Sequence, residues 1–380
     1  MDNCAKCTSS NTQNTPATCI ECAGDLYLKT DGSTTSCVAA EQCNNGFFPT
    51  TDSSNKKVCV KCSDKTKGAI ADCAKCSLQV SSARAGAAVT CTECGSTKKL
   101  SPLKDACLDS CPAGTYDNSI CTPCHTSCAE CNGNANQDSC TACYPGSVLN
   151  RTTDSGSTGT CIPECTGRYA ENCEPDMFTA NIGGSKYCSK CKSGYVLVDG
   201  LCVSAGTRAA PAGCTPGDGV CSSCTGTYFK ESGGCYLSTA YPGNTLCSNA
   251  AAGKCTTCAN GQTPDQQTGS CPVCPAGCSK CIGSGDPKTC SECLAGYYLS
   301  SSKCVKCTEN SNGITGVPNC VSCAAPTTSG PVTCYVAQSS VPTDLSRTDL
   351  HKELGEQFTL AASPWGTTYF WPSTSGAYVV

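Results

Sequence analysis

Residues 121–143 are CTPCHTSCAECNGNANQDSCTAC, and this stretch decides the fold. Its six cysteines are Cys121, Cys124, Cys128, Cys131, Cys140 and Cys143. Residues 271–293, CPVCPAGCSKCIGSGDPKTCSEC, repeat the same intervals with Cys271, Cys274, Cys278, Cys281, Cys290 and Cys293. Six cysteines in one register indicate an internal repeat, and such repeats are typical of chains built from small similar modules.

The composition of the whole chain agrees with this pattern. Cysteine accounts for 44 of 380 residues, about 12%, which exceeds the ~8–10% typical of a disulfide scaffold. Six Phe, two Trp and two Met are too few for a large core, and 37 Gly with 21 Pro leave little room for helix. These numbers exclude TIM barrels, Rossmann folds, helical bundles and coiled coils. We predict small disulfide-rich repeats with short β-hairpins, elongated, with little helix and no large hydrophobic core.

Three intervals between cysteines predict the hairpins directly. Ten residues separate Cys191 from Cys202, Cys224 from Cys235 and Cys293 from Cys304. Each interval contains a short Tyr/Leu/Val run, followed by Asp-Gly, Gly-Gly or Ser-Ser before the closing cysteine, which is typical of a β-hairpin. We expect the aromatic side chain of each unit to pack on a neighbouring disulfide and form a small local core.

The spacing divides the chain into three parts. We predict N-terminal cysteine-rich repeats over residues 1–120 and furin-like repeats over 121–336, including the duplicated unit. Residues 337–380 form a tail without cysteine. A short helix is expected around Ser346 to Gln357, and the rest of the tail is expected to be poorly ordered, because no staple offsets its chain entropy.

Zinc is the first alternative to disulfides, since paired Cys-x-x-Cys motifs have the spacing of zinc sites. Forty-four thiolates holding about eleven zinc ions would take the net charge from −4 to about −26, with only 26 Lys and Arg to oppose it. Disulfides add no charge and persist in an oxidising compartment. The even count fits complete pairing, so we predict disulfides and no cofactor, with a mixture that includes one or two zinc sites as the alternative. A zinc-binding interaction protein is the third hypothesis for function.

The sixteen Cys-x-x-Cys pairs give little indication of haem binding or of redox catalysis. Cys121-Thr-Pro-Cys124-His125 matches a haem-attachment pattern, but the equivalent position in the second copy is Pro275. Redox Cys-x-x-Cys motifs need a thioredoxin-like strand and helix, which no pair has. No phosphate-binding loop, nucleophile elbow or metalloprotease motif occurs. We therefore predict that the protein is not an enzyme.

Other features bear on partners and location. Asn150-Arg-Thr152 is the single glycosylation sequon, in a polar loop that we expect to be accessible. A net charge of −4 argues against nucleic acid as a partner. No run of about 18 apolar residues predicts a membrane span, and the first residues lack the pattern of a secretory signal.

The motifs resemble a known family, the variant-specific surface proteins of Giardia. The resemblance rests on the Cys-x-x-Cys density, on Cys37-Val-Ala-Ala-Glu-Gln-Cys43 and on the motif Gly233, Gly234, Cys235 and Tyr236. It covers roughly residues 1–336, and residues 316–326 are similar to the region before the family's membrane anchor. The family's signal peptide and its transmembrane ending with a basic tail have no counterpart here, so we expect a fragment or a truncated, frameshifted or recombined gene copy.

The resemblance implies a cell-surface coat antigen of a parasite that takes part in antigenic variation and immune evasion. Disulfides would make such a coat resistant to proteases, and its variable loops would meet host antibodies. The alternative is an extracellular ligand-binding module like the furin-type repeats, which share the Cys-x2-Cys-x3-Cys-x2-Cys spacing. A contiguous apolar or charged patch would favour that alternative.

Overall fold

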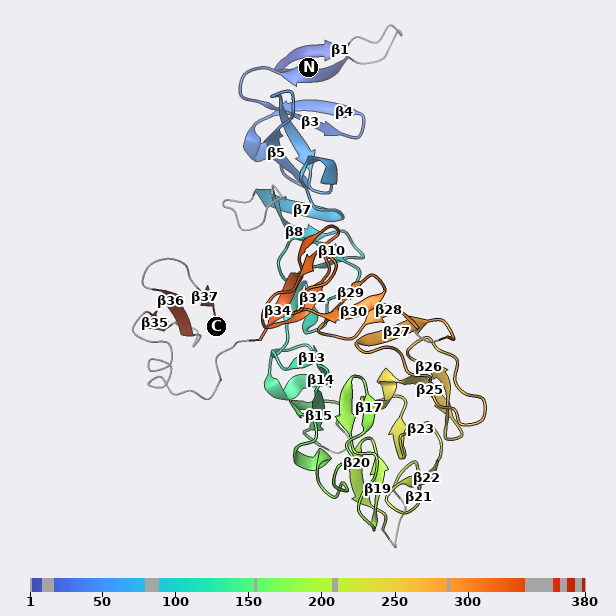
Figure 1. Ribbon diagram of the computed structural model, residues 1–380. Coiled ribbons are helices and arrows are strands. Elements are labelled where there is room, and N and C mark those ends of the chain that lie inside the picture. The colour runs from blue at the N-terminus through green and yellow to red at the C-terminus, as the bar shows by residue number, and fades with distance from the viewer. Residues whose placement is uncertain are drawn as a thin grey trace.

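The computed structural model describes residues 2–8, 17–78, 89–153, 156–206, 211–285, 288–338, 358–362, 368–372 and 378–379. Within these ranges the chain forms strands of two to six residues and single 3-10 turns of three residues. The turns are η1 (Ala40–Gln42), η2 (Lys65–Lys67), η3 (Gln137–Ser139), η4 (Gly167–Tyr169) and η5 (Gly243–Thr245). The predicted fold class of disulfide-rich repeats with short hairpins and little helix is confirmed (Figure 1).

One kind of module is a cysteine hairpin, in which the first cysteine of one strand bonds to the first cysteine of the other. Its strands deviate from regular pairing, as β-bulges do. The seven cysteine hairpins are β1 (Cys4–Thr8) with β2 (Thr18–Cys22), β7 (Cys73–Leu78) with β8 (Val89–Cys94), β13 (Cys128–Cys131) with β14 (Cys140–Cys143), β21 (Cys214–Pro216) with β22 (Cys221–Cys224), β25 (Cys247–Ala251) with β26 (Lys254–Cys258), β27 (Cys278–Ile282) with β28 (Thr289–Cys293), and β32 (Cys320–Ala324) with β34 (Thr333–Ala337).

The second kind of module is a hairpin whose second strand alone carries a cysteine. These hairpins are β3 (Tyr27–Asp31) with β4 (Thr34–Val38), β5 (Phe47–Thr51) with β6 (Lys57–Lys61), β11 (Thr115–Asn118) with β12 (Ile120–Pro123), β15 (Ser147–Arg151) with β16 (Gly159–Pro163), β19 (Tyr195–Val198) with β20 (Leu201–Ser204), β23 (Tyr228–Glu231) with β24 (Gly234–Leu237), and β29 (Tyr297–Ser300) with β30 (Lys303–Lys306). Several join into four-stranded sheets, such as β4-β3-β6-β5 and β20-β19-β24-β23.

The remaining strands complete the sheets and the tail. They are β9 (Lys99–Leu100) and β10 (Cys107–Leu108), β17 (Ala180–Ile182) and β18 (Ser185–Tyr187), β31 (Ile314–Thr315) and β33 (Gly330–Pro331), and the tail strands β35 (Phe358–Ala362), β36 (Thr368–Pro372) and β37 (Tyr378–Val379). The helix expected between Ser346 and Gln357 lies outside the described residues, and the boundaries after residues 120 and 336 stay predictions.

The three hairpins predicted from ten-residue intervals are confirmed as β19–β20, β23–β24 and β29–β30. All three have two-residue turns, but one turn differs from the prediction. Glu231 pairs with Gly234, so the turn consists of Ser232 and Gly233 rather than of the two glycines. Both turn residues have positive φ, 42° and 81°, which this kind of tight turn requires. Gly234 belongs to β24 instead.

The N-terminal modules form an arm, and the later modules turn back on the chain (Figure 1). The amide of Gln338 donates to the carbonyl of Thr126 at 3.5 Å, joining the end of the repeats to their middle. At the same junction a Cβ on Gly114 would lie 2.2 Å from the Tyr144 hydroxyl and 3.3 Å from Val336. The arm is therefore held by contacts between modules adjacent in sequence. In the body, the end of the repeats also contacts residues near their middle, as the Gln338–Thr126 hydrogen bond shows.

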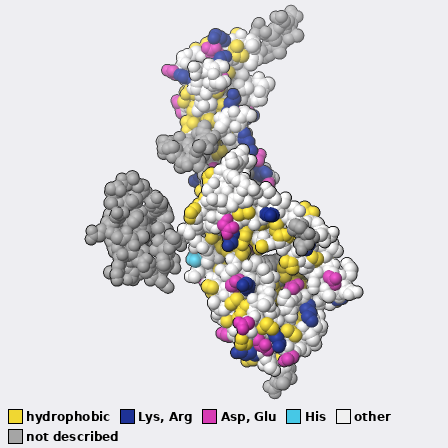
Figure 2. All heavy atoms as spheres, in the orientation of Figure 1, with side chains coloured by type: hydrophobic (Ala, Val, Ile, Leu, Met, Phe, Trp, Pro, Cys, Tyr) yellow, Lys and Arg dark blue, Asp and Glu magenta, His cyan; other side chains and the backbone are white. Residues whose placement is uncertain are grey.

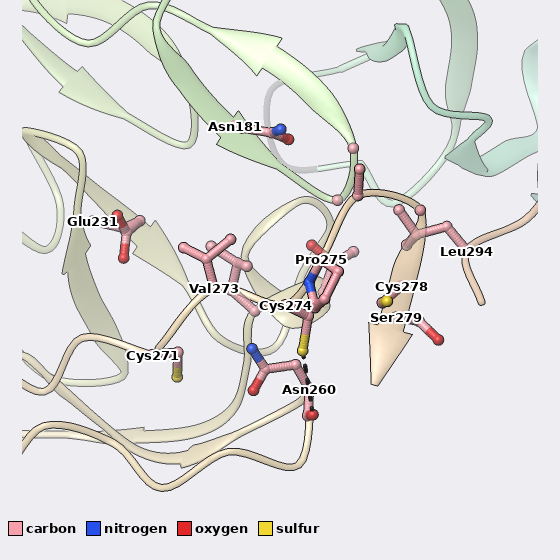
Figure 3. A pocket seen from close by; sticks show the side chains of 16 residues that line it. Asn181, Glu231, Asn260, Cys271, Val273, Cys274, Pro275, Cys278, Ser279 and Leu294 are labelled. Atoms are coloured by element: carbon pink, nitrogen blue, oxygen red, sulfur yellow. Dashed lines mark hydrogen bonds between the residues drawn. The ribbon is translucent and has the colours of Figure 1, made fainter. Parts of the chain in front are cut away.

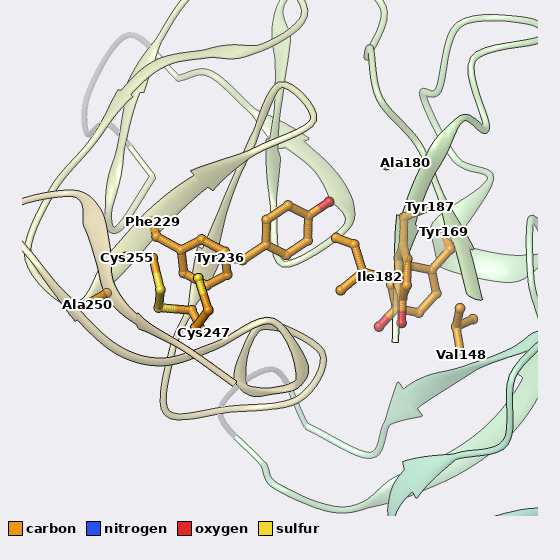
Figure 4. Close-up of a cluster of buried hydrophobic side chains, with 11 residues drawn as sticks. Val148, Tyr169, Ala180, Ile182, Tyr187, Phe229, Tyr236, Cys247, Ala250 and Cys255 are labelled. Atoms are coloured by element: carbon orange, nitrogen blue, oxygen red, sulfur yellow. A yellow bond between two sulfur atoms is a disulfide. The ribbon is translucent and has the colours of Figure 1, made fainter. Parts of the chain in front are cut away.

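Buried side chains gather in six separate clusters within the described residues, in line with the prediction of no large core. The largest cluster is nevertheless shared between modules. It brings Val148 together with Tyr187, Phe229 and Tyr236, all nearly inaccessible to solvent (Figure 4). Aromatic rings pack edge to face there, with Tyr169 and Tyr187 centred 5.5 Å apart.

Candidate functional surface on a disulfide framework

Disulfides join 42 of the 44 cysteines in 21 bonds. The prediction of a disulfide scaffold is confirmed, but complete pairing was wrong, because Cys7 and Cys165 are free. Cys7 is exposed on β1, and Cys165 is partly buried after β16. An even count cannot reveal two cysteines that stay unbonded, such as Cys7, whose opposite residue Cys19 is already bonded to Cys4.

The duplicated six-cysteine unit has one connectivity in both copies. In each copy the first cysteine bonds backward, Cys121 to Cys111 and Cys271 to Cys258. The second bonds to the fourth, the third to the fifth, and the sixth to a cysteine of the next hairpin. These pairs are Cys124–Cys131, Cys128–Cys140 and Cys143–Cys161 in one copy, and Cys274–Cys281, Cys278–Cys290 and Cys293–Cys304 in the other.

No Cys-x-x-Cys pair, all of which the structure describes, is closed by a bond between its own two cysteines. Residues three apart in an extended strand are separated by about 10 Å, beyond the 4.4–6.8 Å Cα distance that a disulfide spans. A redox motif cycles through that internal bond, so the redox hypothesis fails. The haem hypothesis also fails, because Cys121 and Cys124 are both in disulfides and His125 Nδ1 lies 2.8 Å from Ser127 Oγ.

Neighbouring disulfides lie so close together that their sulfurs have the spacing of ligands in a metal site. The sulfurs of Cys19 and Cys37 are 3.7 Å apart, and those of Cys255 and Cys271 are 3.5 Å apart. Several groups of three cysteine sulfurs lie within 4.8 Å of one another, among them Cys19, Cys22 and Cys37. All three of those sulfurs are in disulfides, whereas zinc binds thiolates, so a zinc site there would first require reduction.

In the motif from Gly233 to Tyr236 the last three residues are buried, whereas Gly233 is half-buried in the turn. Cys235 bonds to Cys224, and the Tyr236 ring is fully buried beside Phe229. A Cβ on Gly234 would lie 3.0 Å from both the Leu197 Cβ and the Tyr236 ring, so only glycine fits without displacement. Gly234 thereby permits β24 to lie close to β19, with which it pairs.

A carboxylate ties this motif to the neighbouring turn. Asp199 Oδ1 accepts a hydrogen bond from the Leu237 N–H at 2.8 Å. Burial raises the pKa of Asp199 above its ordinary value, although the Leu237 N–H and the Arg151 charge oppose the shift. Burial also raises the pKa of Tyr236, to which the Asp199 charge adds, and takes that of Tyr169 to about 12. The ionised Asp199 carboxylate is therefore destabilised in the folded protein.

Replacing Asp199→Asn should raise the melting temperature at pH 7 and leave it nearly unchanged at pH 3. Asparagine retains an oxygen acceptor for Leu237 and tolerates the positive φ of 49° at this position. Because the folded-state pKa is raised, wild-type stability falls as pH rises from the unfolded value through the folded one. Calorimetry at both pH values measures this effect. An equal shift at pH 3 and pH 7 would contradict it.

The sequon residue Asn150 lies in β15, opposite Thr160, rather than in the loop where it was expected. It is half-buried at the end of its hairpin, and the Thr152 hydroxyl donates to the Thr158 carbonyl at 3.2 Å. The five-residue pairing of β15 with β16 extends beyond the sequon asparagine, which polarity alone did not indicate. Glycosylation at Asn150 stays a prediction.

Charged side chains are scattered over the visible face, without a field of one sign (Figure 2). A cross-strand ion pair recurs in three cysteine hairpins, at Lys6–Glu21 (2.8 Å), Lys75–Glu93 (2.5 Å) and Lys280–Glu292 (2.9 Å). Such exposed pairs contribute little stability. They neutralise charge locally, and the charged patch that would favour a ligand-binding module does not appear on this face.

A hollow of about 120 Å³ lies between the β17–β18 hairpin and the loop after β26. Asn181, Glu231, Val273, Pro275 and Leu294 are among the residues around it (Figure 3). Ligand pockets usually measure 300–1,000 Å³. This hollow is therefore smaller than a typical ligand pocket.

These features define a class of protein, a cysteine-rich scaffold of hairpin modules held by disulfides, as found in extracellular and cell-surface proteins. The family model described as "Giardia variant-specific surface protein" matches residues 63–255 and 249–350. The chain therefore belongs to the Giardia variant-specific surface protein family, as its motifs indicated. Among the described residues no helix is long and apolar enough to cross a membrane.

Curated relatives agree with this assignment. The major surface-labeled trophozoite antigen 417 of Giardia intestinalis is 31% identical, over 90% of this chain and 63% of its own length. Variant-specific surface protein VSP4A1 of the same organism is 32% identical over 41% of this chain and 29% of its own length. The chain thus spans less than two thirds of these relatives. Proprotein convertase subtilisin/kexin type 5 of Mus musculus is 31% identical over 39% of this chain, but over only 7% of the convertase.

Proposed function

We propose that this protein is a non-enzymatic coat antigen of the parasite surface, taking part in antigenic variation, with host antibodies as partners of its loops. The Giardia surface antigens among its relatives support a role at the cell surface. The proposal of antigenic variation rests on the contrast between the disulfides, which hold the fold, and the loops between them. It requires loops that change without disturbing the disulfides that hold the fold.

The two copies of the six-cysteine unit supply the observation that carries the proposal. Residues 132–139 are NGNANQDS and residues 282–289 are IGSGDPKT, so both loops have eight residues and share only one glycine. That glycine has positive φ in both copies, 67° at Gly133 and 101° at Gly283, so its retention has a backbone reason. Identical connectivity thus holds loops of different sequence, and the described parts of both loops are mainly exposed.

Energetics support the same division. The buried Cys128–Cys140 bond closes the loop 132–139 at its base, and both sulfurs are inaccessible to solvent. Surface loops tolerate changes in sequence at low energetic cost when their ends are fixed. Disulfides constrain the unfolded state by about 2–4 kcal/mol each, though not additively, which favours resistance to proteases.

A loop exchange tests the proposal. Replacing residues 132–139 by the sequence of 282–289 should leave the peptide map of disulfides and the rate of chymotrypsin digestion unchanged, since neither loop contains an aromatic residue or leucine. Serum antibodies raised against the native chain should lose a measurable fraction of their binding, and antibodies affinity-purified on peptide 132–139 should lose all of it. The control is the single substitution Ala129→Gly at a buried position, which leaves the exposed loop 132–139 unchanged. Loss of native pairing on exchange, or unchanged binding by the purified antibodies, would refute the proposal.

A further inference from the structure

The cross-strand ion pair of the β1–β2 hairpin has a third member. Three cysteine hairpins carry a lysine that faces a glutamate in the same register, and these pairs are Lys6–Glu21, Lys75–Glu93 and Lys280–Glu292. Of the three glutamates, Glu21 alone takes a second lysine among the described ion pairs, since Lys56 Nζ lies 3.8 Å from the carboxylate that Lys6 Nζ approaches at 2.8 Å. Lys56 comes from another module, at the end of the turn between β5 and β6. Two ammonium groups therefore share one carboxylate, which leaves one positive charge uncompensated.

A hollow of about 360 Å³, here called the arm hollow, lies beside this cluster. Its walls are the β1–β2 hairpin, residues 24–28 and residues 54–57 around the β5–β6 turn, and Lys6, Glu21 and Lys56 all line it. Its volume falls within the 300–1,000 Å³ that ligand pockets usually measure. The uncompensated charge therefore borders a space large enough for a small ligand.

The other charges around the arm hollow are balanced. Lys57 also lines it, but Asp25 forms an ion pair with the Lys57 ammonium group. Asp52 does not line it, and the Lys67 charge compensates that of Asp52. The hydrogen bond from the opposite lysine holds the pKa of Glu21 below its usual range, so the Glu21 carboxylate stays ionised at neutral pH. The arm hollow therefore has a surplus of one positive charge.

The turn that brings Lys56 to this site is ordered by its own hydrogen bonds. Asp52 Oδ1 accepts from the N–H of Ser54 at 2.8 Å and from that of Lys56 at 3.0 Å. The Asn55 N–H donates to the Asp52 carbonyl at 3.0 Å, and Asn55 takes the positive φ of 59° that the turn needs. Disulfides hold the β1–β2 hairpin that forms the opposite wall. A ligand therefore meets walls that are already in place, which reduces the entropy lost on binding.

Uncharged side chains around the arm hollow suit a sugar ring. The Ser54 hydroxyl and the Asn55 amide belong to exposed residues and have no hydrogen-bond partner among the described residues. Ile20 is 39% exposed, and the partly buried Leu26 and Leu28 line the same hollow. Ligand sites combine apolar surface with a few polar groups that fix orientation. A sugar presents hydroxyl groups together with apolar C–H faces, and the arm hollow offers partners for both.

We propose that the arm hollow binds one sugar unit that carries a single anionic group, either a carboxylate or a sulfate. The anionic group lies between the ammonium groups of Lys6 and Lys56 and supplies the negative charge that Glu21 alone does not. Charge-assisted hydrogen bonds of this kind are about twice as strong as neutral ones. The sugar hydroxyls bind the side chains of Ser54 and Asn55. This binding goes beyond the proposed coat function and does not depend on it.

Ligand-observed NMR titrations of the full, oxidised chain test this proposal. The probes are methyl β-glucuronide for the carboxylate, glucose 6-sulfate for the sulfate, methyl β-glucoside as the neutral sugar, and acetate as an anion without a ring. One or both anionic sugars should bind about fivefold more tightly than the glucoside and than acetate. Raising the salt concentration from about 20 mM to about 500 mM should remove most of the preference over the glucoside, because salt screens exposed charges.

Two substitutions should move the affinity in opposite directions. Lys56→Gln should weaken binding of the preferred anionic sugar about three- to fivefold, because it removes the surplus charge. Glu21→Gln should strengthen binding by a similar factor, because both ammonium groups then lack a carboxylate, and a gain in affinity cannot arise from misfolding. Lys75→Gln is the matched control and should leave the affinity unchanged, since it breaks the equivalent ion pair with Glu93 away from the arm hollow.

Several results would overturn the proposal. Equal binding of the glucoside would mean that charge plays no part, and equal binding of acetate would mean that the sugar ring plays none. Absence of binding by both anionic sugars also contradicts the proposal, as does an unchanged affinity in Lys56→Gln, weaker binding in Glu21→Gln, or a loss of equal size in Lys75→Gln. None of these results bears on the coat function, which the loop exchange at residues 132–139 tests separately.

Discussion

Tyr236→Ala is expected to destabilise the module around β23–β24 by about 3–5 kcal/mol, the range for removing a large buried aromatic side chain. Tyr236 is fully buried in the largest hydrophobic cluster and packs beside Phe229, with ring centroids 6.2 Å apart. The substitution leaves a cavity between modules that the Cys224–Cys235 bond prevents from collapsing freely. Hydrogen exchange at the amides of β23 and β24 should accelerate by about 10²–10⁴-fold.

Tyr236→Phe is the matched control for this prediction. The Tyr236 hydroxyl is buried and has no hydrogen-bond partner in the described structure, so removing it relieves an unsatisfied polar group. We expect protection in β23–β24 to be equal to that of the wild type or higher. If Tyr236→Phe were as damaging as Tyr236→Ala, the hydroxyl rather than the ring packing would support this core.

The second large effect is expected from the paired substitution Cys128→Ser and Cys140→Ser. Removing a native disulfide from a small disulfide-stabilised module typically costs about 2–5 kcal/mol. Both sulfurs are inaccessible to solvent, so the hydroxyls also replace apolar contacts in the cluster that contains Leu149. Replacing both cysteines together avoids a new thiol that could exchange with the neighbouring Cys124–Cys131 bond. The glutamate-specific protease Glu-C should then cut after Glu130 at a rate at least tenfold above that of the wild type.

Cys165→Ser provides the comparison, because it removes a sulfur without removing a bond. Digestion of this variant should proceed at the wild-type rate. Equal digestion rates for the paired variant and the wild type would mean that the other disulfides of this hairpin, Cys124–Cys131 and Cys143–Cys161, are sufficient to hold it. Mass spectrometry of the first cleavage products separates these results, since it locates the cut as well as its rate.

Much of the local structure was predictable because it follows from short-range chemistry. Ten residues between Cys224 and Cys235, with aromatic residues before a turn, leave a hairpin as the natural way to bring two sulfurs together. The choice of turn residues was only partly predictable. Gly233 and Gly234 look alike in sequence, yet one supplies a positive φ and the other admits the close approach of Leu197. That difference exists only once β19 lies beside β24.

The candidate surface was predictable in kind but not in detail. The framework of disulfides and the family followed from the cysteine pattern, and the loops followed as the segments between fixed points. The free state of Cys7 and Cys165 was not predictable, because the spacing of cysteines does not show which of them stay unbonded. The burial of residues 234–236 was not predictable either, since it depends on Val148 and Tyr187 arriving from other modules.

The sequence by itself determined the module, its repetition and the use of cysteine as disulfide, because these depend on spacing, charge and turns over about ten residues. The tertiary structure alone decided which sulfurs bond, which modules share a core and where the chain turns back. A Cys-x-x-Cys pair on a strand holds its sulfurs too far apart to bond with each other. The bonded cysteines therefore take their partners from other segments of the chain, and only the packing of hairpins brings those segments into place.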